Sequence, residues 1–358
     1  MPEYKKQHYV PQFYFRFFSM DGHKINQFNL DNERVDFIPI GKVCQKSYFY
    51  SKDPELEKSF SDLEAEHNRV IKNVIQTHHF PRTILDNYYL LNFIAFQPQR
   101  TLKNKERVDQ MTDTIVKKAI SSDISLIQKG ITEEVLKSVK ISHKGMFLYS
   151  VLSSFFSDIL ILDLKQVLLI NESSDDFIFS DNPVICYNLV FHKEKTGFKG
   201  LQSPGIIVFC PLDSRHVIVL YDSVFYEFLP ANSDRITIHD RNDVKAINAL
   251  QYFNCFNNVY YANNQQQQQI VNMYMEFKNS IGYRKKIFAQ INNFVLRTVN
   301  NTEEMDVLRF STYSMNYNLS TSFIKINKPL PKNIPYQRDL DLVNLFKKTL
   351  KEYISAMD

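Results

Sequence analysis

Four groups of polar residues stand inside apolar stretches of this sequence, where side chains able to do chemistry can be held in place. They are Gln7, His8 and Gln12; Glu64 and Glu66; Gln97 and Arg100; and Ser180, Asp181, Asn182 and Pro183. The first group lies in the run KKQHYVPQFYFRFF, whose six aromatic rings must insert into the body of the protein. A buried amide or imidazole without a partner costs about 1–3 kcal/mol. Each group therefore either finds partners within the fold or serves a site.

These residue types together suit the cleavage of a phosphodiester bond. His8 can exchange protons near neutral pH, and the planar guanidinium of Arg100 can donate two parallel hydrogen bonds to a phosphate. Asp181 and Glu64 can act as a base or bind a divalent ion such as Mg²⁺, which prefers oxygen ligands. We therefore expect a nuclease or related phosphodiesterase with His8, Arg100 and Asp181 as catalytic residues. Glu64 and Asp181 are the candidate metal ligands.

Further polar residues in the same groups are expected to orient a substrate or water. These candidate substrate-binding residues are Gln7, Tyr9, Gln97 and Asn182. The expected partner is nucleic acid, and a toxin or phage-defence setting fits such an enzyme.

The alternative is a noncatalytic module that binds nucleic acid or protein, in which the polar cluster only specifies the fold. In that interpretation Asp181 caps the end of a strand, Arg100 meets helix carbonyls, and Glu64 lies on a solvated helix face. Basic surfaces then make the contacts. Their candidates are Lys103, Lys105 and Arg107, or Lys193, Lys195 and Lys199. A third hypothesis is chemistry on a nucleotide or NAD-like ligand, with Arg100 on phosphate and Tyr9 or Tyr14 stacked on a base.

The elements that must position these residues follow from hydrophobic periodicity. Residues 24–30 and 33–40 alternate around Asp31 and Asn32, which predicts a hairpin. Helical spacing begins at residue 54, where a proline follows Asp53, and recurs over residues 86–96 before Pro98. An exposed helical pair with a break at Gly130 covers residues 102–140. Further helices are expected over residues 146–161, 242–262, 265–279 and 340–354.

Apolar runs predict further strands, which are short and close together along the chain. They cover residues 43–51, 165–171, 177–179, 184–187, 206–211 and 216–221, and strands return after Lys286. Strands followed by helices, then by strands and helices again, indicate an α+β fold with a mainly antiparallel sheet and one large domain. We expect residues 1–285 to form the main domain, which includes the inserted N-terminal segment and the hairpin. Residues 286–358 are expected to form a strand–helix extension packed on it.

Composition excludes several classes of protein. Only 8 of the 358 residues are Gly, and neither GxGxxG nor GxxxxGK[ST] occurs, which disfavours a nucleotide fold that cradles phosphates with glycine. The four cysteines are widely spaced and form no CxxC pair, so they indicate buried thiols in a reducing compartment. The net charge of +4 is too small for nonspecific coating of nucleic acid. No leader or membrane span is evident, so we expect a soluble, cytoplasmic protein.

The opening QHYVPQFYFRFFS resembles the QHYVPxFYLxxF start of a bacterial family of unknown function, domain of unknown function 4238. Five further segments resemble that family in the same order: LEAEHNRVIKNV, FIAFQPQRT, FIFSDNPV, CPLDSRHVIVLYD and INALQYFNCFNNVYYA. Phe15, where the family has leucine more often, and Leu102, where it tends to proline, depart from the pattern. The resemblance implies a fold group rather than a reaction. It also implies that the polar groups belong to one domain and converge on one pocket.

Overall fold

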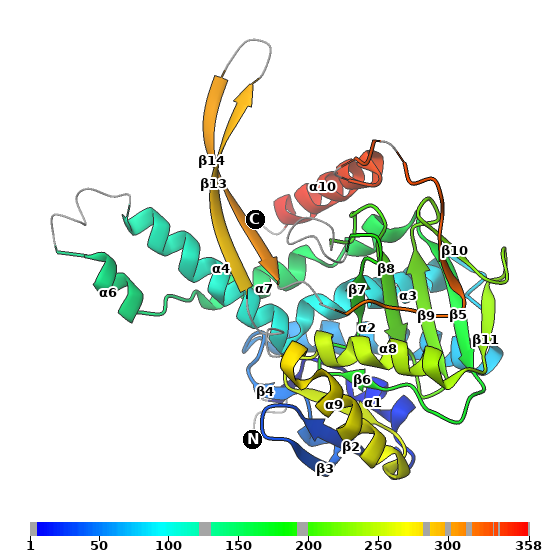
Figure 1. Cartoon of the computed structure of the whole chain (residues 1–358). Coiled ribbons are helices and arrows are strands. Elements are labelled where there is room, and N and C mark those ends of the chain that lie inside the picture. The colour runs from blue at the N-terminus through cyan, green and yellow to red at the C-terminus, as the bar shows by residue number, and fades with distance from the viewer. Residues whose placement is uncertain are drawn as a thin grey trace.

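In the computed structural model, a five-stranded sheet lies at the centre of an α+β fold, in the order β11-β5-β9-β8-β7 (Figure 1). Neighbouring strands are antiparallel except for β11 and β5, which are parallel. The strands are β5 (Lys165–Asn171), β7 (Ile185–Tyr187), β8 (Ile207–Pro211), β9 (His216–Tyr221) and β11 (Arg235–Ile238). The prediction for β5 and β9 is confirmed at the same bounds, and β7 and β8 begin one residue later than predicted. Strand β11 was not predicted.

The residues that the structure describes are 6–121, 130–191, 200–281, 287–297, 302–312, 317–331, 333–335 and 337–356. The basic cluster Lys193, Lys195 and Lys199 lies outside these residues.

Helices cover both faces of the five-stranded sheet (Figure 1). Helix α2 (Pro54–Thr77) and helix α3 (Ile84–Phe96) share a hydrophobic core with Leu168 and Ile218 on one face. Helix α8 (Arg241–Asn254) shares a second core with the residues of the other face. Helix α2 begins as predicted, because Asp53 accepts a hydrogen bond from the backbone of Glu55 and Pro54 occupies the first turn.

A second, four-stranded antiparallel sheet runs in the order β3-β2-β12-β6. Its strands are β2 (Lys24–Asn29), β3 (Arg34–Pro39), β6 (Phe179–Ser180) and β12 (Asn258–Tyr261). The β2–β3 hairpin confirms the sequence prediction. The helix predicted over residues 242–262 is wrong beyond Asn254, because Val259 and Tyr260 pair as a strand between β2 and β6. β-Branched and aromatic residues favour such a half-buried pleated position.

The N-terminal aromatic segment inserts into the core, as its composition predicts. It forms strand β1 (Lys6–His8) and helix α1 (Gln12–Phe18), and β1 pairs with β4 (Gln45–Ser47). Tyr14 and Phe15 have no exposed surface and contact Phe179 edge to face, at ring-centre distances of 5.2 and 5.1 Å. The hydroxyl of Tyr14 also donates to the carbonyl of Pro211 at the end of β8, so the segment joins the four-stranded sheet to the five-stranded one.

The remaining helices and turns connect these layers. The helices are α4 (Leu102–Ser121), α6 (Glu133–Ser138), α7 (Lys144–Ser153) and α9 (Gln267–Ile281), and the short 3₁₀ helices are η1 (Ile40–Lys42), η2 (Gln97–Arg100), η3 (Ser157–Ile161) and η4 (Asn264–Gln266). Helix α3 ends at Phe96, and Pro98 lies in the first turn of the 3₁₀ helix η2 that follows it directly. Among the residues described, no helix combines the length and apolarity that crossing a membrane requires.

The C-terminal part begins with a long hairpin of β13 (Ile287–Arg297) and β14 (Thr302–Thr312), which projects from the body (Figure 1). Strand β15 (Ile324–Ile326) then pairs with β10 (Tyr226–Phe228), and helix α10 (Leu340–Ser355) follows. Arg338 anchors the segment before α10: its guanidinium pairs with Asp163 and donates to the carbonyls of Leu160, Leu201 and Ser203.

Candidate functional site

The guanidinium of Arg100 is buried at the end of η2, with 3% of its side chain exposed. Nη2 pairs with Oε1 of Glu64 at 2.6 Å and donates to the backbone carbonyl of His8 at 3.0 Å. Nε donates to the hydroxyl of Tyr50 at 3.1 Å, and three aromatic rings surround the cation at 5.4 to 5.9 Å. Arg100 therefore ties the N-terminal segment to α2 and to the segment before it, and it presents no face to solvent.

Two glutamines also bind backbone atoms around the N-terminal segment. Gln97 donates from Nε2 to the carbonyl of Tyr9 at 2.9 Å. Gln7 donates to the carbonyl of Ser51 at 2.7 Å and accepts from the backbone N–H of Tyr50 at 2.8 Å. Tyr9 itself is buried, with 6% exposed. We call Gln7, Tyr50, Glu64, Gln97 and Arg100 the Arg100 cluster.

His8 contributes its backbone rather than its ring to the Arg100 cluster. Its imidazole is half-buried and hydrogen-bonds the backbone of Gly41. Burial lowers the pKa of His8 to about 4, so the ring is neutral at pH 7. Its Nε2 is hidden from solvent and has no hydrogen-bond partner. The ring lies close enough to Arg100 to be affected by its charge, and their assignment as catalytic residues stays a prediction.

Asp181 stabilises the turn that connects α8 to β12. Its carboxylate accepts three backbone N–H groups, from Phe256 at 2.6 Å, Asn257 at 2.7 Å and Asn258 at 3.0 Å. Burial raises the pKa of this carboxyl, and 1% of the residue is exposed. Among the residues described, no hydrogen bond or ion pair joins Asp181 to His8 or to Arg100. The structure therefore brings His8 and Arg100 together and places Asp181 in a separate network.

Asn182 and Lys103 converge on one backbone carbonyl. Asn182 donates to the carbonyl of Asn254 at 3.3 Å, and the ammonium of Lys103 donates to the same oxygen at 2.8 Å. This contact joins residues 180–183 to the start of α4. Arg107 lies one turn further along that helix, on the face of Lys103.

Residues 6–265 match the model of a family described as a protein of unknown function, DUF4238. The chain belongs to the DUF4238 family. The matched range contains all four polar groups, and β13, β14, β15 and α10 lie beyond it. No curated protein and no solved structure matches the chain.

The two candidate metal ligands of this DUF4238 chain, Glu64 and Asp181, each have other partners, and the metal site stays a prediction. Glu64 pairs with Arg100, and Asp181 is occupied by backbone donors. Within the described ranges, no group of three or more His, Cys, Asp or Glu side chains is arranged to hold a metal ion.

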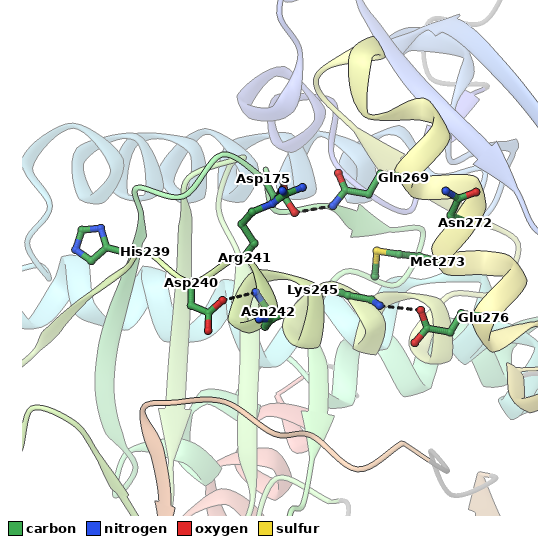
Figure 2. A pocket seen from close by; sticks show the side chains of 10 residues that line it. All are labelled: Asp175, His239, Asp240, Arg241, Asn242, Lys245, Gln269, Asn272, Met273 and Glu276. Carbon is green, nitrogen blue, oxygen red and sulfur yellow. Dashed lines mark hydrogen bonds and ion pairs between the residues drawn. The ribbon is translucent and has the colours of Figure 1, made fainter.

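A cleft of about 750 Å³ lies between α8 and α9, and its lining shares no residue with the Arg100 cluster (Figure 2). Asp175 stands at one end of it, where its carboxylate accepts from Arg241 at 2.9 Å and from Gln269 at 2.7 Å. Lys245 and Glu276 pair across the cleft at 2.8 Å. Arg241 and Lys245 are thus each paired with a carboxylate, and Asp240, which pairs with no cation among the described residues, adds one negative charge to the lining.

Sequence reasoning did not identify Tyr50, Asp175 or Arg241. Tyr50 gave no signal because it stands among other aromatic residues. Asp175 lies in an acidic pair just before the buried, apolar residues 177–179, and this contrast is the signal that identifies it.

Proposed function

We propose that the chain binds a phosphate-bearing ligand, with nucleic acid as the expected class, through Arg107 at the start of α4. In this proposal the Arg100 cluster is structural, and the chain acts as a binding module rather than through the catalytic set expected from the sequence.

The observation that carries the proposal is a cation without an anion. Arg107 makes one weak hydrogen bond, from Nη2 to Oε1 of Gln99 at 3.4 Å, and no described carboxylate pairs with it. Its Nε is hidden from solvent and has no partner. Burial lowers the pKa of Arg107, which means that its charge is poorly solvated. Such a charge is costly unless it is paired, and a phosphate is the anion whose geometry its fork fits.

The position of Arg107 also fits a ligand contact. It is partly exposed, whereas Arg100 is 2% exposed. Lys103, one turn earlier, adds a second positive charge at the carbonyl of Asn254. Lys105 differs from both, because its ammonium pairs with Asp109 at 2.6 Å. Of the three cations expected at this surface, Arg107 is therefore the one that we assign to the ligand.

Cleavage of the bound nucleic acid stays a prediction from the sequence, as does a toxin or phage-defence setting. Two of the residues expected to perform cleavage bind other parts of the protein instead. Arg100 binds a backbone carbonyl and Glu64, and Asp181 accepts three backbone N–H groups. A group that attacks or protonates a phosphodiester must reach it. The contacts therefore favour binding over cleavage. Stacking of a base on Tyr9 or Tyr14 is disfavoured for the same reason, since both rings are buried.

Fluorescence anisotropy with labelled single-stranded RNA, single-stranded DNA and duplex DNA tests the proposal. Arg107→Gln should weaken binding about tenfold and lower the salt slope by about one, because one phosphate contact is lost. The matched control is Lys105→Gln, which removes an internally paired cation from the same helix and should bind nearly as the parent does. The stability of Arg107→Gln should be unchanged or raised.

Two outcomes would overturn the proposal. In one, the parent binds none of the three probes at low salt. In the other, Arg107→Gln binds as tightly as the parent. A denaturing gel of the same mixtures with Mg²⁺ separates binding from cleavage, and cleavage that survives Asp181→Asn would point to other catalytic residues.

A further inference from the structure

We propose that His78 and His216 form a zinc-binding site in which Asp213 orients His216. The site joins the end of α2 to the turn between β8 and β9. It is independent of the ligand proposed for Arg107.

His216 is held in the state that a metal ligand requires. Its Nδ1 lies 2.9 Å from Oδ1 of Asp213, and that same oxygen accepts the backbone N–H groups of Arg215 and His216 at 2.7 Å each. A carboxylate partner assigns the proton to Nδ1 and leaves a lone pair on Nε2. A metal-binding histidine almost always donates its other ring N–H to such an oxygen, which fixes the ring and raises its basicity.

The Nε2 of His216 is also a buried atom that needs an explanation. The residue is 7% exposed, and Nε2 is hidden from solvent without a hydrogen-bond partner. Unpaired buried polar atoms are uncommon in native proteins, and a bound ion is one of the accepted reasons for them.

His78 supplies the second imidazole. It ends α2 in the left-handed region, with φ at 59°, a conformation that is uncommon for a residue other than glycine. This places its ring with the centre 4.8 Å from that of His216. Two imidazoles on one tetrahedral zinc ion, with Zn–N distances of about 2.0–2.1 Å, have ring centres about 5 Å apart. The observed separation matches, and the exposed side of His78 gives zinc a way in.

Two protein ligands leave two positions for water or another small ligand. No group of three or more His, Cys, Asp or Glu side chains among the residues described is arranged to hold a metal, so we assign the other two positions on zinc to ligands from solvent. Imidazole nitrogen is a preferred ligand of zinc.

The test is a titration of chelator-treated full-length protein with Zn²⁺ alone, followed by competition with a zinc indicator. Co²⁺ absorption reports the coordination separately. We expect one Zn²⁺ per chain, and a loss of affinity of tenfold or more in His78→Gln, which alters an exposed residue and leaves the core intact. Asp213→Asn should weaken binding about 10- to 100-fold. The matched control is His79→Gln, which removes the neighbouring exposed imidazole and should bind as the parent does.

The proposal fails if the parent binds no Zn²⁺ at millimolar concentration. It also fails if His78→Gln binds with the affinity of the parent, since any zinc bound would then lie elsewhere. A rise in melting temperature on adding Zn²⁺ should occur in the parent and in His79→Gln, but not in His78→Gln.

Discussion

Replacing Arg100 by methionine separates the structural interpretation of the Arg100 cluster from the catalytic one. Methionine keeps much of the apolar contact with the three surrounding rings but removes every donor. The carbonyl of His8 then keeps only the long hydrogen bond from the Tyr50 hydroxyl at 3.4 Å, that hydroxyl loses a donor, and Glu64 loses its cation.

The size of the effect follows from burial. Breaking a buried ion pair by removing one partner costs about 3–5 kcal/mol. The Arg100 side chain is 3% exposed but that of Glu64 is 24% exposed, so the abandoned carboxylate is partly hydrated and the cost falls at the lower end. We expect a loss of about 3 kcal/mol in the free energy of unfolding, measured by urea denaturation followed by circular dichroism.

The matched control is Arg69→Met on α2. Arg69 pairs with Glu66 and Asp86, yet its side chain is 50% exposed, so the stability should change little. Should Arg100→Met unfold at the same urea concentration as the parent, the cluster does not hold the fold together. A catalytic role for Arg100, which predicts an unchanged fold and a loss of activity, would then be the better explanation.

Three further predictions concern other buried charges. Asp181→Asn leaves one oxygen to accept three backbone N–H groups and should lower the melting temperature by several degrees, whereas an unchanged melting temperature would show that the turn does not depend on the carboxylate. Burial raises the pKa of Asp158 from 3.8 to about 6, so the native state binds more protons across this window and the free energy of unfolding falls as pH rises through it. Asp158→Asn should therefore gain about 2–3 kcal/mol at pH 7 and flatten that pH profile in urea titrations; a profile as steep as that of the parent would contradict the assignment. Arg338→Ala should release α10, seen as rapid proteolysis near residues 327–340 while the remainder resists, and equal resistance of both proteins would refute the anchor.

Much of the fold could be predicted because buried segments show recognisable apolar patterns in the sequence. Strands β5 and β9 each contain an unbroken apolar run, at residues 167–170 and 217–221, and the whole of β9 is buried. Helix α2 carries its own start signal in Asp53 and Pro54. These features are local, so sequence alone identifies them.

Pairing between distant segments could not be predicted. Residues 258–261 continue an apolar pattern after α8 and became a strand only because β2 and β6 lie on either side. The short strand β4 was expected within residues 43–51, but nothing local indicates that it pairs with β1.

The candidate site shows the same difference between local features, which the sequence reveals, and distant partners, which it does not. The sequence identified His8, Gln97, Arg100 and Asp181 as unusual, because they are polar residues in apolar surroundings. It could not identify their partners, since most of these are backbone atoms that every residue type carries. A polar side chain that recognises a substrate and one that recognises a carbonyl look alike in sequence.

The inserted N-terminal segment has a consequence for synthesis on the ribosome. Tyr14 and Phe15 emerge early, yet the rings that cover them, Phe179 and Tyr260, are translated far later. Until then a strongly apolar peptide stays uncovered, and such exposed surface promotes aggregation. We expect nascent chains to need protection by a holding chaperone until about residue 260, after which the segment closes into place.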